Sequence, residues 1–402
     1  MEFTLTDEQR MVQQMVKDFT RSEVAPVIKE FDRKQEMASF ILPRMGELGI
    51  LGICIPVKYG GQGMDYISLG LACEELEAVD SSLRVVMSVH VGLNSMGLLQ
   101  WATEEQKERF LVPQAQGLKI ACFGLTEPGA GSDVASIMST GRREGDSYVL
   151  NGEKMWISLA TKADHALVVV RTRQDSGKPH SGLTAFLVEL NRPGVRRGDI
   201  HGKLGVRAGS TGWLAFDDVR VPVENRIGEE GEGFQIAMSC LDNGRYTVAA
   251  GATGLIRACL DASVHYAKER KAFGREIGKM QLVQQKVAKM VQSYEISRLL
   301  YLKVGWMKNK GMRNTRETSL AKWFATDESF KAASEAIQVH GAYGYSDEYD
   351  VERYLRNSKG AVIYEGTSEI HQLIQAGYAF GYREDGNLRC ELPAFNAEIW
   401  QN

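Results

Sequence analysis

The fold class is decided by the stretch Tyr148-Val149-Leu150-Asn151-Gly152-Glu153-Lys154-Met155-Trp156-Ile157-Ser158. Its two apolar runs, 148–150 and 154–158, are separated by Asn-Gly, the typical centre of a two-residue β-hairpin turn. Short runs separated by Gly, Pro, Asn and Asp follow at 165–171, 183–190 and 213–216. This spacing predicts an all-β unit from residue 121 to about residue 222.

Helical periodicity precedes this unit. Thr6 and Gln9 are spaced as a capping box, and apolar residues then recur at helical spacing up to Phe19. Two more helical patterns, 74–78 and 85–99, are separated by Asp80-Ser81-Ser82, which is typical of a helix end followed by a new helix start.

Helical periodicity also follows the β unit. Helices are predicted at 234–241, 246–271, 283–294 and 318–339, and Gly341 is placed to end the last of them. Long helices with Ala-rich and Leu-rich faces usually form bundles.

The chain is therefore expected to be an α+β protein. It would have an N-terminal helical domain (1–119), a middle β-barrel or β-sandwich domain (120–228), a C-terminal four-helix bundle (229–381) and a tail (382–402) that either wraps a surface or is partly disordered. A flat cofactor could lie in the crevice between the β domain and the bundle.

Composition excludes several function classes. The 402 residues carry a net charge of -3 and are 44% hydrophobic. No basic field exists to bind nucleic acid, and no apolar run approaches the ~20 residues of a membrane span. The N-terminus lacks the pattern of a targeting segment, so a cytoplasmic protein is expected. The six cysteines and seven histidines have no ligand spacing, so neither a metal site nor a disulfide framework is predicted.

The stretch Ile363-Tyr364-Glu365-Gly366-Thr367-Ser368-Glu369-Ile370-His371 holds the main catalytic candidate. Glu365 lies between apolar residues and a Gly-Thr-Ser turn, where loss of hydration would raise the carboxyl pKa toward that of a general base. The alternative is a glutamate that only caps the following helix or faces water.

Three further stretches can hold ligands. The glycine-rich stretch 123–133 offers backbone N–H groups and hydroxyls to a flat or phosphorylated ligand, or is a surface turn. Trp156 and Ser158 share a strand face and could stack on and hydrogen-bond a ring system, or belong to the core. Arg270 and Phe273 could bind a pyrophosphate and a nucleoside, although cations favour helix C-termini anyway.

These stretches, together with 338–344, occur in the order and approximate spacing of the acyl-CoA dehydrogenase family, which the chain resembles up to about residue 380. The resemblance implies an FAD-dependent homotetramer that oxidises an acyl-CoA to the trans-2-enoyl-CoA and passes electrons to an electron-transferring flavoprotein. Glu365 would be the base that removes the α-proton. Some members place the base just before the position of Arg245, but that residue is Gly244 here.

The resemblance also implies the roles of individual residues. Thr126 and Ser158 would hydrogen-bond the flavin, and Trp156 would stack on it. A neighbouring subunit would hold the ADP half of FAD. The full set for the cofactor is Phe123, Leu125, Thr126, Ser132, Trp156, Ser158, Arg270, Phe273, Gln281, Gln338, Gly341, Ala342, Thr367 and Glu369, and the set for the substrate is Glu77, Arg84, Ser132, Asp242, Arg245, Tyr364 and Gly366.

Arg84 is the residue most informative about the acyl group. A cation in a helix that lines an acyl pocket needs an anionic partner. That partner is either Glu77, two helical turns away, or a distal carboxylate of the substrate, as the resemblance to glutaryl-CoA dehydrogenases implies. Val85, where those enzymes have a small hydroxyl, leaves benzylsuccinyl-CoA, other bulky acyl groups and short monocarboxylyl thioesters as alternatives. A flavin oxidase, a monooxygenase and a non-catalytic binding protein are the competing classes.

Overall fold

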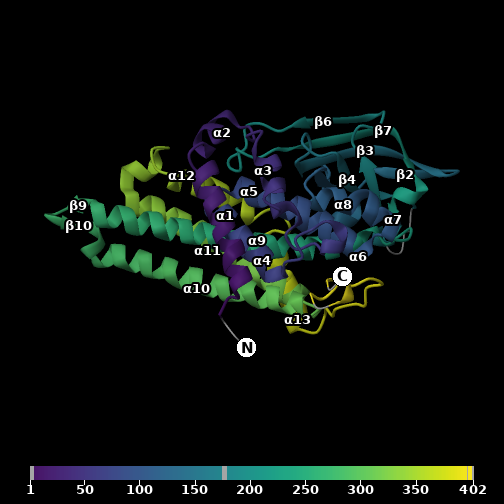
Figure 1. Cartoon of the computed structure of the whole chain (residues 1–402). Coiled ribbons are helices and arrows are strands. Elements are labelled where there is room, and N and C mark those ends of the chain that lie inside the picture. The colour runs from purple at the N-terminus through teal and green to yellow at the C-terminus, as the bar shows by residue number, and fades with distance from the viewer. Residues whose placement is uncertain (1–3, 174–178, 396, 401–402) are drawn as a thin grey trace.

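The computed structural model describes residues 4–173, 179–395 and 397–400. The order helices, β sheet, helices is the predicted one, and the sheet lies at the end of the molecule opposite the β9–β10 tip of the bundle (Figure 1). No helix within these ranges is long and apolar enough to span a membrane. Residues 1–3, which belong to the N-terminus expected to lack a targeting segment, and residues 401–402 of the tail lie outside the described residues.

Short helices form the N-terminal part. The predicted capping box is confirmed, because Thr6 Oγ1 accepts from the Gln9 N–H at 3.2 Å. Asp80 begins a new helix as predicted, with its carboxylate accepting from the Ser82 N–H at 2.8 Å. The helices are α1 (Asp7–Phe19), α2 (Ile28–Lys34), α3 (Ile41–Glu47), α4 (Tyr66–Glu77), α5 (Ser81–Val86), α6 (Met96–Trp101), α7 (Glu104–Gln106) and α8 (Val112–Ala115), and the π-helical segments are η1 (Thr20–Val24), η4 (Met87–Ser95) and η5 (Lys107–Leu111).

The middle part is one sheet with the strand order β6-β7-β3-β2-β4-β5-β8, and β1 pairs with β4. The hydrophobic runs at 165–171 and 183–190 form β4 and β5 as predicted. The strands are β1 (Ala121–Gly124), β2 (Thr140–Glu144), β3 (Ser147–Ser158), β4 (His165–Arg171), β5 (Leu183–Glu189), β6 (Val195–Asp199), β7 (Thr211–Pro222) and β8 (Arg226–Ile227).

The hairpin predicted at Asn151-Gly152 is wrong. β3 runs through both residues, and the chain reverses earlier, between β2 and β3. Gly152 has φ +134 and marks a register shift against β7 rather than a turn. A glycine bulge and a glycine turn can have the same local sequence. Here the pairing of β3 with both β2 and β7 keeps the strand continuous, so Gly152 forms a bulge.

The C-terminal part is a helical bundle extended by a two-stranded tip. Helices α9, α10 and α11 pack on one another, and α9 also packs on α4. Gly341 ends α11 with φ +62, as predicted. The elements are α9 (Gly233–Glu269), β9 (Lys271–Ala272), β10 (Arg275–Glu276), α10 (Gln281–Asn309), α11 (Thr315–His340), α12 (Val351–Ala361) and α13 (Ser368–Ala379).

The separate helices expected at 234–241 and 246–271 are wrong, because α9 is continuous from Gly233 to Glu269. The sequence Asp242-Asn243-Gly244 has weak helix propensity, and a glycine in a helix costs about 1 kcal/mol relative to alanine. Packing offsets this cost. Asn243 and Gly244 are buried, and a Cβ on Gly92 of η4 would lie 3.2 Å from the Gly244 Cα.

The described part of the tail wraps a surface. Arg389 pairs with Glu232 at 2.8 Å, Gln100 Nε2 donates to the Cys390 carbonyl at 2.8 Å, and the Tyr66 hydroxyl donates to the Pro393 carbonyl at 2.8 Å. These bonds attach the tail to α6, α4 and the start of α9. The expected domain boundaries at 119/120, 228/229 and 381/382 stay predictions.

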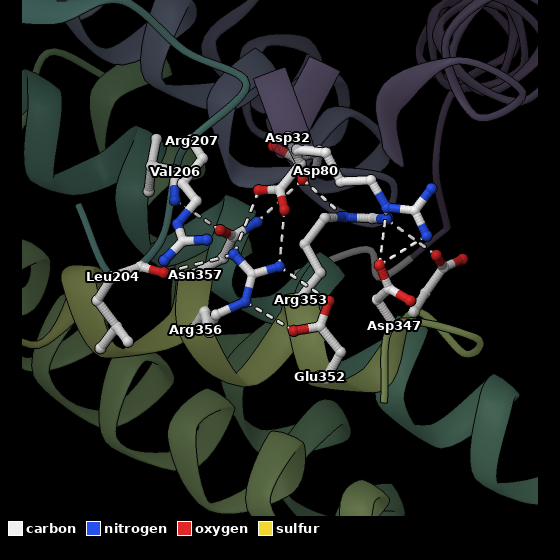
Figure 2. A network of polar contacts seen from close by, with 12 residues as sticks. Asp32, Asp80, Leu204, Val206, Arg207, Asp347, Glu352, Arg353, Arg356 and Asn357 are labelled. Carbon is white, nitrogen blue, oxygen red and sulfur yellow. Dashed lines mark hydrogen bonds and ion pairs between the residues drawn. The ribbon is translucent and has the colours of Figure 1, made fainter. Parts of the chain in front are cut away.

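A polar network joins the N-terminal helices, the β domain and α12 (Figure 2). The buried Asp80 carboxylate accepts from Arg353 Nε at 3.0 Å and from Asn357 Nδ2 at 2.9 Å. The side-chain amide oxygen of Asn357, Oδ1, in turn accepts from the Val206 N–H of the β domain at 2.6 Å. Helix α12, which leads into the catalytic loop, is thus fixed to both the start of α5 and the β domain.

Arg356 adds a second link on the same face of α12 (Figure 2). Its guanidinium pairs with Asp32 of α2 at 2.7 Å and with Glu352 at 2.7 Å. It also donates to the Leu204 carbonyl at 3.4 Å. Charge-assisted bonds of this kind are stronger than neutral ones, so they hold the direction in which α12 enters the loop.

Candidate active site

Glu365 lies in the loop between α12 and α13 with its carboxylate pointing into the protein. One oxygen, Oε1, accepts from the Ser88 hydroxyl of η4. The other, Oε2, is buried and has no hydrogen-bond partner among the described residues. Burial raises the pKa of this carboxyl, while the Ser88 bond and the nearby Arg84, Lys322 and Arg245 act in the opposite direction. A buried carboxylate with one free oxygen can accept a proton from a bound ligand.

Gly244 leaves the space that the Glu365 carboxylate occupies. A Cβ at position 244 would lie 2.2 Å from Glu365 Oε2 and 2.9 Å from its carboxyl carbon. A side chain on residue 244 and the Glu365 carboxylate would therefore compete for one place. The glycine is required here for close approach rather than for backbone freedom, because it lies inside α9.

The backbone of the loop is held from two sides. Glu365 has φ +54 and Gly366 has φ +100, so both residues are in left-handed conformations. Arg245 Nε donates to the Glu365 carbonyl at 2.9 Å, and Lys322 Nζ donates to the Gly366 carbonyl at 2.8 Å. Thr367 caps α13 by accepting from the Ile370 N–H at 3.4 Å.

Asp242 lies behind Arg245 rather than in an open position. Its carboxylate pairs with Arg245 Nη1 at 3.1 Å and accepts from the Thr315 hydroxyl at 2.7 Å. In this structure Asp242 therefore orients Arg245. Glu369, in the first turn of α13, is exposed.

Arg84 is paired with Glu77. Its Nε lies 2.6 Å from Glu77 Oε2, both side chains are 1% exposed, and the Ser81 hydroxyl donates to the other carboxylate oxygen at 2.7 Å. Arg84 Nη2 also donates to the Tyr364 hydroxyl, and the guanidinium carbon lies 5.2 Å from the centre of the Tyr364 ring. Glu77, one of the two anionic partners expected from the sequence, is thus in contact with Arg84, and the distal substrate carboxylate stays a prediction.

Trp156 lies at a second irregularity of β3. The register with β7 shifts between Met155 and Ile157, and Trp156 has φ +61 with 59% of its surface exposed. A bulky residue with positive φ is rare and costs about 1–3 kcal/mol. The bulge therefore presents the indole outward instead of packing it in the core.

Two hydroxyls accompany the exposed indole. The Thr126 carbonyl accepts from the Met155 N–H at 2.9 Å, which places β3 beside the glycine-rich stretch. Among the described residues, neither the Thr126 nor the Ser158 hydroxyl has a hydrogen-bond partner. An outward indole with two free hydroxyls fits the flat ring system of FAD, which combines stacking surface with acceptor atoms.

The glycine-rich stretch contains a surface turn, and its role in binding a ligand stays a prediction. Glu127 and Ala130 exchange backbone hydrogen bonds of 3.1 Å, and Ser132 is exposed beyond them. The buried Glu127 carboxylate, paired with Lys154 at 2.7 Å, anchors the turn to β3. Phe123 and Leu125, predicted to contact the cofactor, are buried.

The residues expected to hold the ADP half lie elsewhere. Arg270 and Phe273 belong to the β9–β10 tip, which Figure 1 shows at the end of the bundle opposite the sheet. Phe273 is 95% exposed with φ +50. The others are also exposed, at the start of α10 and the end of α11: Gln281, Gln338, Gly341 and Ala342. Within one chain, the residues expected to hold the ADP half therefore do not lie beside Trp156.

The structure also shows residues that the sequence reasoning missed. Ser88 and Lys322 contact the Glu365 loop directly, yet neither belongs to a recognisable motif. A serine in the apolar run 85–99 and a lysine between Ala321 and Trp323 were the only available signals. Both residues are common in ordinary helices, so only the fold identifies them.

Comparison with known proteins covers nearly the whole chain. Residues 6–118, 122–219 and 231–378 match the N-terminal, middle and C-terminal domains of acyl-CoA dehydrogenase. The short-chain specific acyl-CoA dehydrogenase of Clostridium acetobutylicum is 40% identical over 94% of this chain and 100% of the relative.

Two solved structures are also similar. Butyryl-CoA dehydrogenase of Megasphaera elsdenii has a TM-score of 0.92 and 39% identity, covering 94% of this chain and 100% of that one. A glutaryl-CoA dehydrogenase in complex with glutaryl-CoA has a TM-score of 0.92 and 36% identity, covering 96% of this chain and 99% of that one. Similarity alone leaves both acyl classes open.

Proposed function

Because this chain belongs to the acyl-CoA dehydrogenase family, whose members are FAD-dependent oxidoreductases acting on CH–CH bonds, we propose that it dehydrogenates a short-chain acyl-CoA with Glu365 as the base. Acyl-CoA is its substrate class and FAD its cofactor. The observation that carries the choice of acyl group is the buried ion pair between Arg84 and Glu77.

Glu365 takes the α-proton of the thioester. Its free, buried Oε2 is the accepting atom, and its raised pKa makes the carboxylate a stronger base than an exposed glutamate. Bound FAD supplies the acceptor for the β-hydrogen, which leaves as hydride. The ring would rest on Trp156 and accept hydrogen bonds from Thr126 and Ser158.

The Glu365 N–H is free to bind the thioester carbonyl. None of the backbone hydrogen bonds among the described residues engages it. Negative charge develops on that oxygen as the α-proton leaves, and one such donor is worth ~3–4 kcal/mol in a water-excluded site. The left-handed backbone at Glu365 thus brings the base and an oxyanion donor from the same residue to one place.

The position of Arg84 limits the length of the acyl chain. Ser88 contacts the base, and Arg84 precedes Ser88 by four residues, a rise of about 6 Å along a helix. The side chain of Tyr364 contacts Arg84 from the side of the catalytic loop. We expect these groups to limit the acyl chain to a few carbon atoms. Since Glu77 already neutralises Arg84, the pocket needs no anionic substrate.

A dicarboxylyl-CoA such as glutaryl-CoA is the second candidate. One observation favours it: Arg84 Nη1 has no hydrogen-bond partner among the described residues. A distal carboxylate could therefore join the pair. Benzylsuccinyl-CoA would be the bulkier form of the same class.

Anaerobic titration of the holoenzyme decides between the two. Butyryl-CoA, octanoyl-CoA, glutaryl-CoA and benzylsuccinyl-CoA would be added separately while the flavin absorbance band is followed. We expect butyryl-CoA to bleach the band at the lowest concentration and octanoyl-CoA to bleach it poorly. Efficient bleaching by glutaryl-CoA alone would overturn the short-chain assignment, and bleaching by none would overturn the proposed function.

Paired variants sharpen this titration. Arg84→Ala leaves Glu77 as a buried unpaired charge, which costs about 3–5 kcal/mol of stability. The double variant Glu77→Gln and Arg84→Met removes the pair together and serves as the control. For a monocarboxylyl substrate the double variant should retain a Michaelis constant within a few-fold of wild type. A selective rise for glutaryl-CoA would favour the second candidate.

Two expectations about partners are part of the proposal. The electron acceptor would be an electron-transferring flavoprotein, tested by dye reduction with and without that protein and by oxygen uptake. The homotetramer would complete each FAD site with the tip of a neighbouring copy, tested by sedimentation. Cytoplasmic location stays a prediction from sequence.

A further inference from the structure

Lys322 is a fully buried cation with no anionic partner in contact. It lies in the first third of α11 and is among the largest completely buried side chains. Among the described residues it forms no ion pair, and its ammonium donates to one backbone carbonyl, that of Gly366, at 2.8 Å. A buried ammonium is costly unless it is paired, so a lysine used only to hold a carbonyl needs an explanation.

The carbonyl that it holds belongs to the most constrained part of the catalytic loop. Glu365 is a non-glycine residue with φ +54, and Gly366 follows it with φ +100. Such conformations persist only where the surroundings impose them. Arg245 from α9 holds the carbonyl of Glu365, and Lys322 from α11 holds the next one.

We propose that Lys322 is a positioning residue for the Glu365 base: by binding the Gly366 carbonyl it fixes the turn that directs the carboxylate toward the substrate, and its charge keeps that carboxylate ionised. The inference rests on the proposed role of Glu365. It adds a residue outside the catalytic motif, on the helix whose Asp327 also binds the Ser368 hydroxyl at the start of α13.

The surroundings of Lys322 support the electrostatic part. The charged and titratable groups that act on it come from several elements: Glu365, Arg245 of α9, Arg84 of α5, and Asp327 on α11 itself. His371 of α13 also faces it, and burial lowers the pKa of that imidazole to about 2, which keeps the ring neutral. Glu365 is thus the carboxylate with the largest electrostatic effect on Lys322. The Asp327 carboxylate already accepts from the Ser368 hydroxyl at 2.6 Å.

The sign of the effect follows from charge. Burial lowers the pKa of Lys322 to about 7, so the side chain carries its positive charge below about pH 7. A nearby cation favours the carboxylate form of Glu365. Removing the cation therefore raises the pKa of Glu365, and the acid limb of the rate profile moves to higher pH.

Lys322→Met and Lys322→Arg test the proposal, with Lys308→Met as the matched control. Lys308 is another buried lysine, and it donates to Asn243 at 2.7 Å instead of to the loop. The rate constant of flavin reduction by butyryl-CoA would be measured anaerobically across pH, with FAD content and melting temperature recorded for each variant. The infrared band of the Glu365 carboxyl would be assigned by its loss in Glu365→Gln. Its intensity across pH would then measure the protonation of Glu365 directly.

We expect Lys322→Met to retain FAD, to reduce its flavin roughly 10- to 100-fold more slowly, and to shift both the acid limb and the carboxyl titration to higher pH. Lys322→Arg should restore most of the rate. Lys308→Met should change stability without moving the pH profile. A wild-type rate and profile in Lys322→Met, or the same shift in Lys308→Met, would overturn the proposal.

Failure of the base assignment would look different. If Glu365→Gln still reduces the flavin, the proposed function is wrong at that residue whatever Lys322 does. If Glu365→Gln is inactive while Lys322→Met is normal, only the positioning role fails. Should Lys322→Met not fold, Lys322→Arg is compared with wild type in the infrared titration. A shifted pH of Glu365 titration together with an unchanged rate of flavin reduction would contradict the proposed coupling.

Discussion

The base loop and the β9–β10 tip are the two ends of one predicted site, and they differ in almost every physical respect. Around Glu365 the side chains are buried and their hydrogen bonds come from α9, α11 and η4 of the same chain. At the tip, Phe273 is 95% exposed on a left-handed backbone, and the Arg270 guanidinium carbon lies 5.8 Å from the centre of the Tyr343 ring. The first region is buried and bonded within one chain, and the second is exposed.

This difference separates two kinds of functional residue. Groups that carry out proton transfer must be dry and fixed, so a single chain buries them. An exposed phenylalanine held in a costly conformation has no benefit within its own chain, and the expected tetramer would supply one. Variants at the two regions should therefore fail in different ways: the base loop in chemistry and the tip in cofactor retention.

The largest effect is expected for Glu365→Gln. It keeps the shape of the side chain but removes the base, so flavin reduction by butyryl-CoA should fall about 10³-fold or more while FAD and thioester remain bound. Stopped-flow absorbance measures the reduction and the visible spectrum measures FAD content. Rapid bleaching would move the base to another residue.

Gly244→Ala should have the next largest effect. Its methyl group would meet Glu365 Oε2 at 2.2 Å and displace the carboxylate, so the reduction rate should fall roughly 100-fold without loss of FAD. The shorter side chain of Glu365→Asp in the same protein should recover part of the rate by making room. An unchanged rate in Gly244→Ala would show that the carboxylate lies elsewhere during turnover.

At the tip, Arg270→Ala should weaken FAD binding and leave the chemistry intact. Loss of a charge-assisted bond of about 1.5–3 kcal/mol corresponds to roughly a 10- to 100-fold rise in the dissociation constant. Arg275→Ala, an exposed arginine of the same tip, is the matched control. Fluorescence titration of the apoprotein with FAD measures binding, and equal effects of the two variants would remove the special role of Arg270.

The smallest effect is on stability. The raised pKa of Glu365 means that the folded state binds a proton more readily than the unfolded state, so its contribution to stability is present at acid pH and is lost as pH rises through the folded pKa. Glu365→Gln should therefore raise the melting temperature by roughly 2 °C at pH 8 and leave it unchanged near pH 4. An equal change at both pH values would contradict desolvation as the cause.

Local sequence signals predicted much of the fold. The Thr6 capping box, the helix start at Asp80, strand β4 and the helix end at Gly341 each depend on a few neighbouring residues. The two errors, a turn at Gly152 and a break at Gly244, both concern glycines. A glycine can indicate a position that does not tolerate a side chain. Only the neighbouring elements in the fold show whether the reason is a turn, a bulge or a close contact.

The catalytic motif could be predicted from the sequence, but the residues that support it could not. Tyr364 to Gly366 form a continuous stretch whose residue types suit a buried base, so the sequence predicts them. Ser88 and Lys322 are 277 and 44 residues away from the groups that they bind. Single polar residues in apolar helices have many ordinary roles, and nothing local distinguishes these two.

By itself, the sequence determined the order of helices, β sheet and helices and the position of a candidate base, because periodicity, capping and motif order are local properties. Only the tertiary structure decided that Arg84 is paired with Glu77, that Gly244 makes room for Glu365, and that Lys322 holds the catalytic loop. The physical reason is that pairing, steric fit and desolvation depend on distances between elements far apart in the chain.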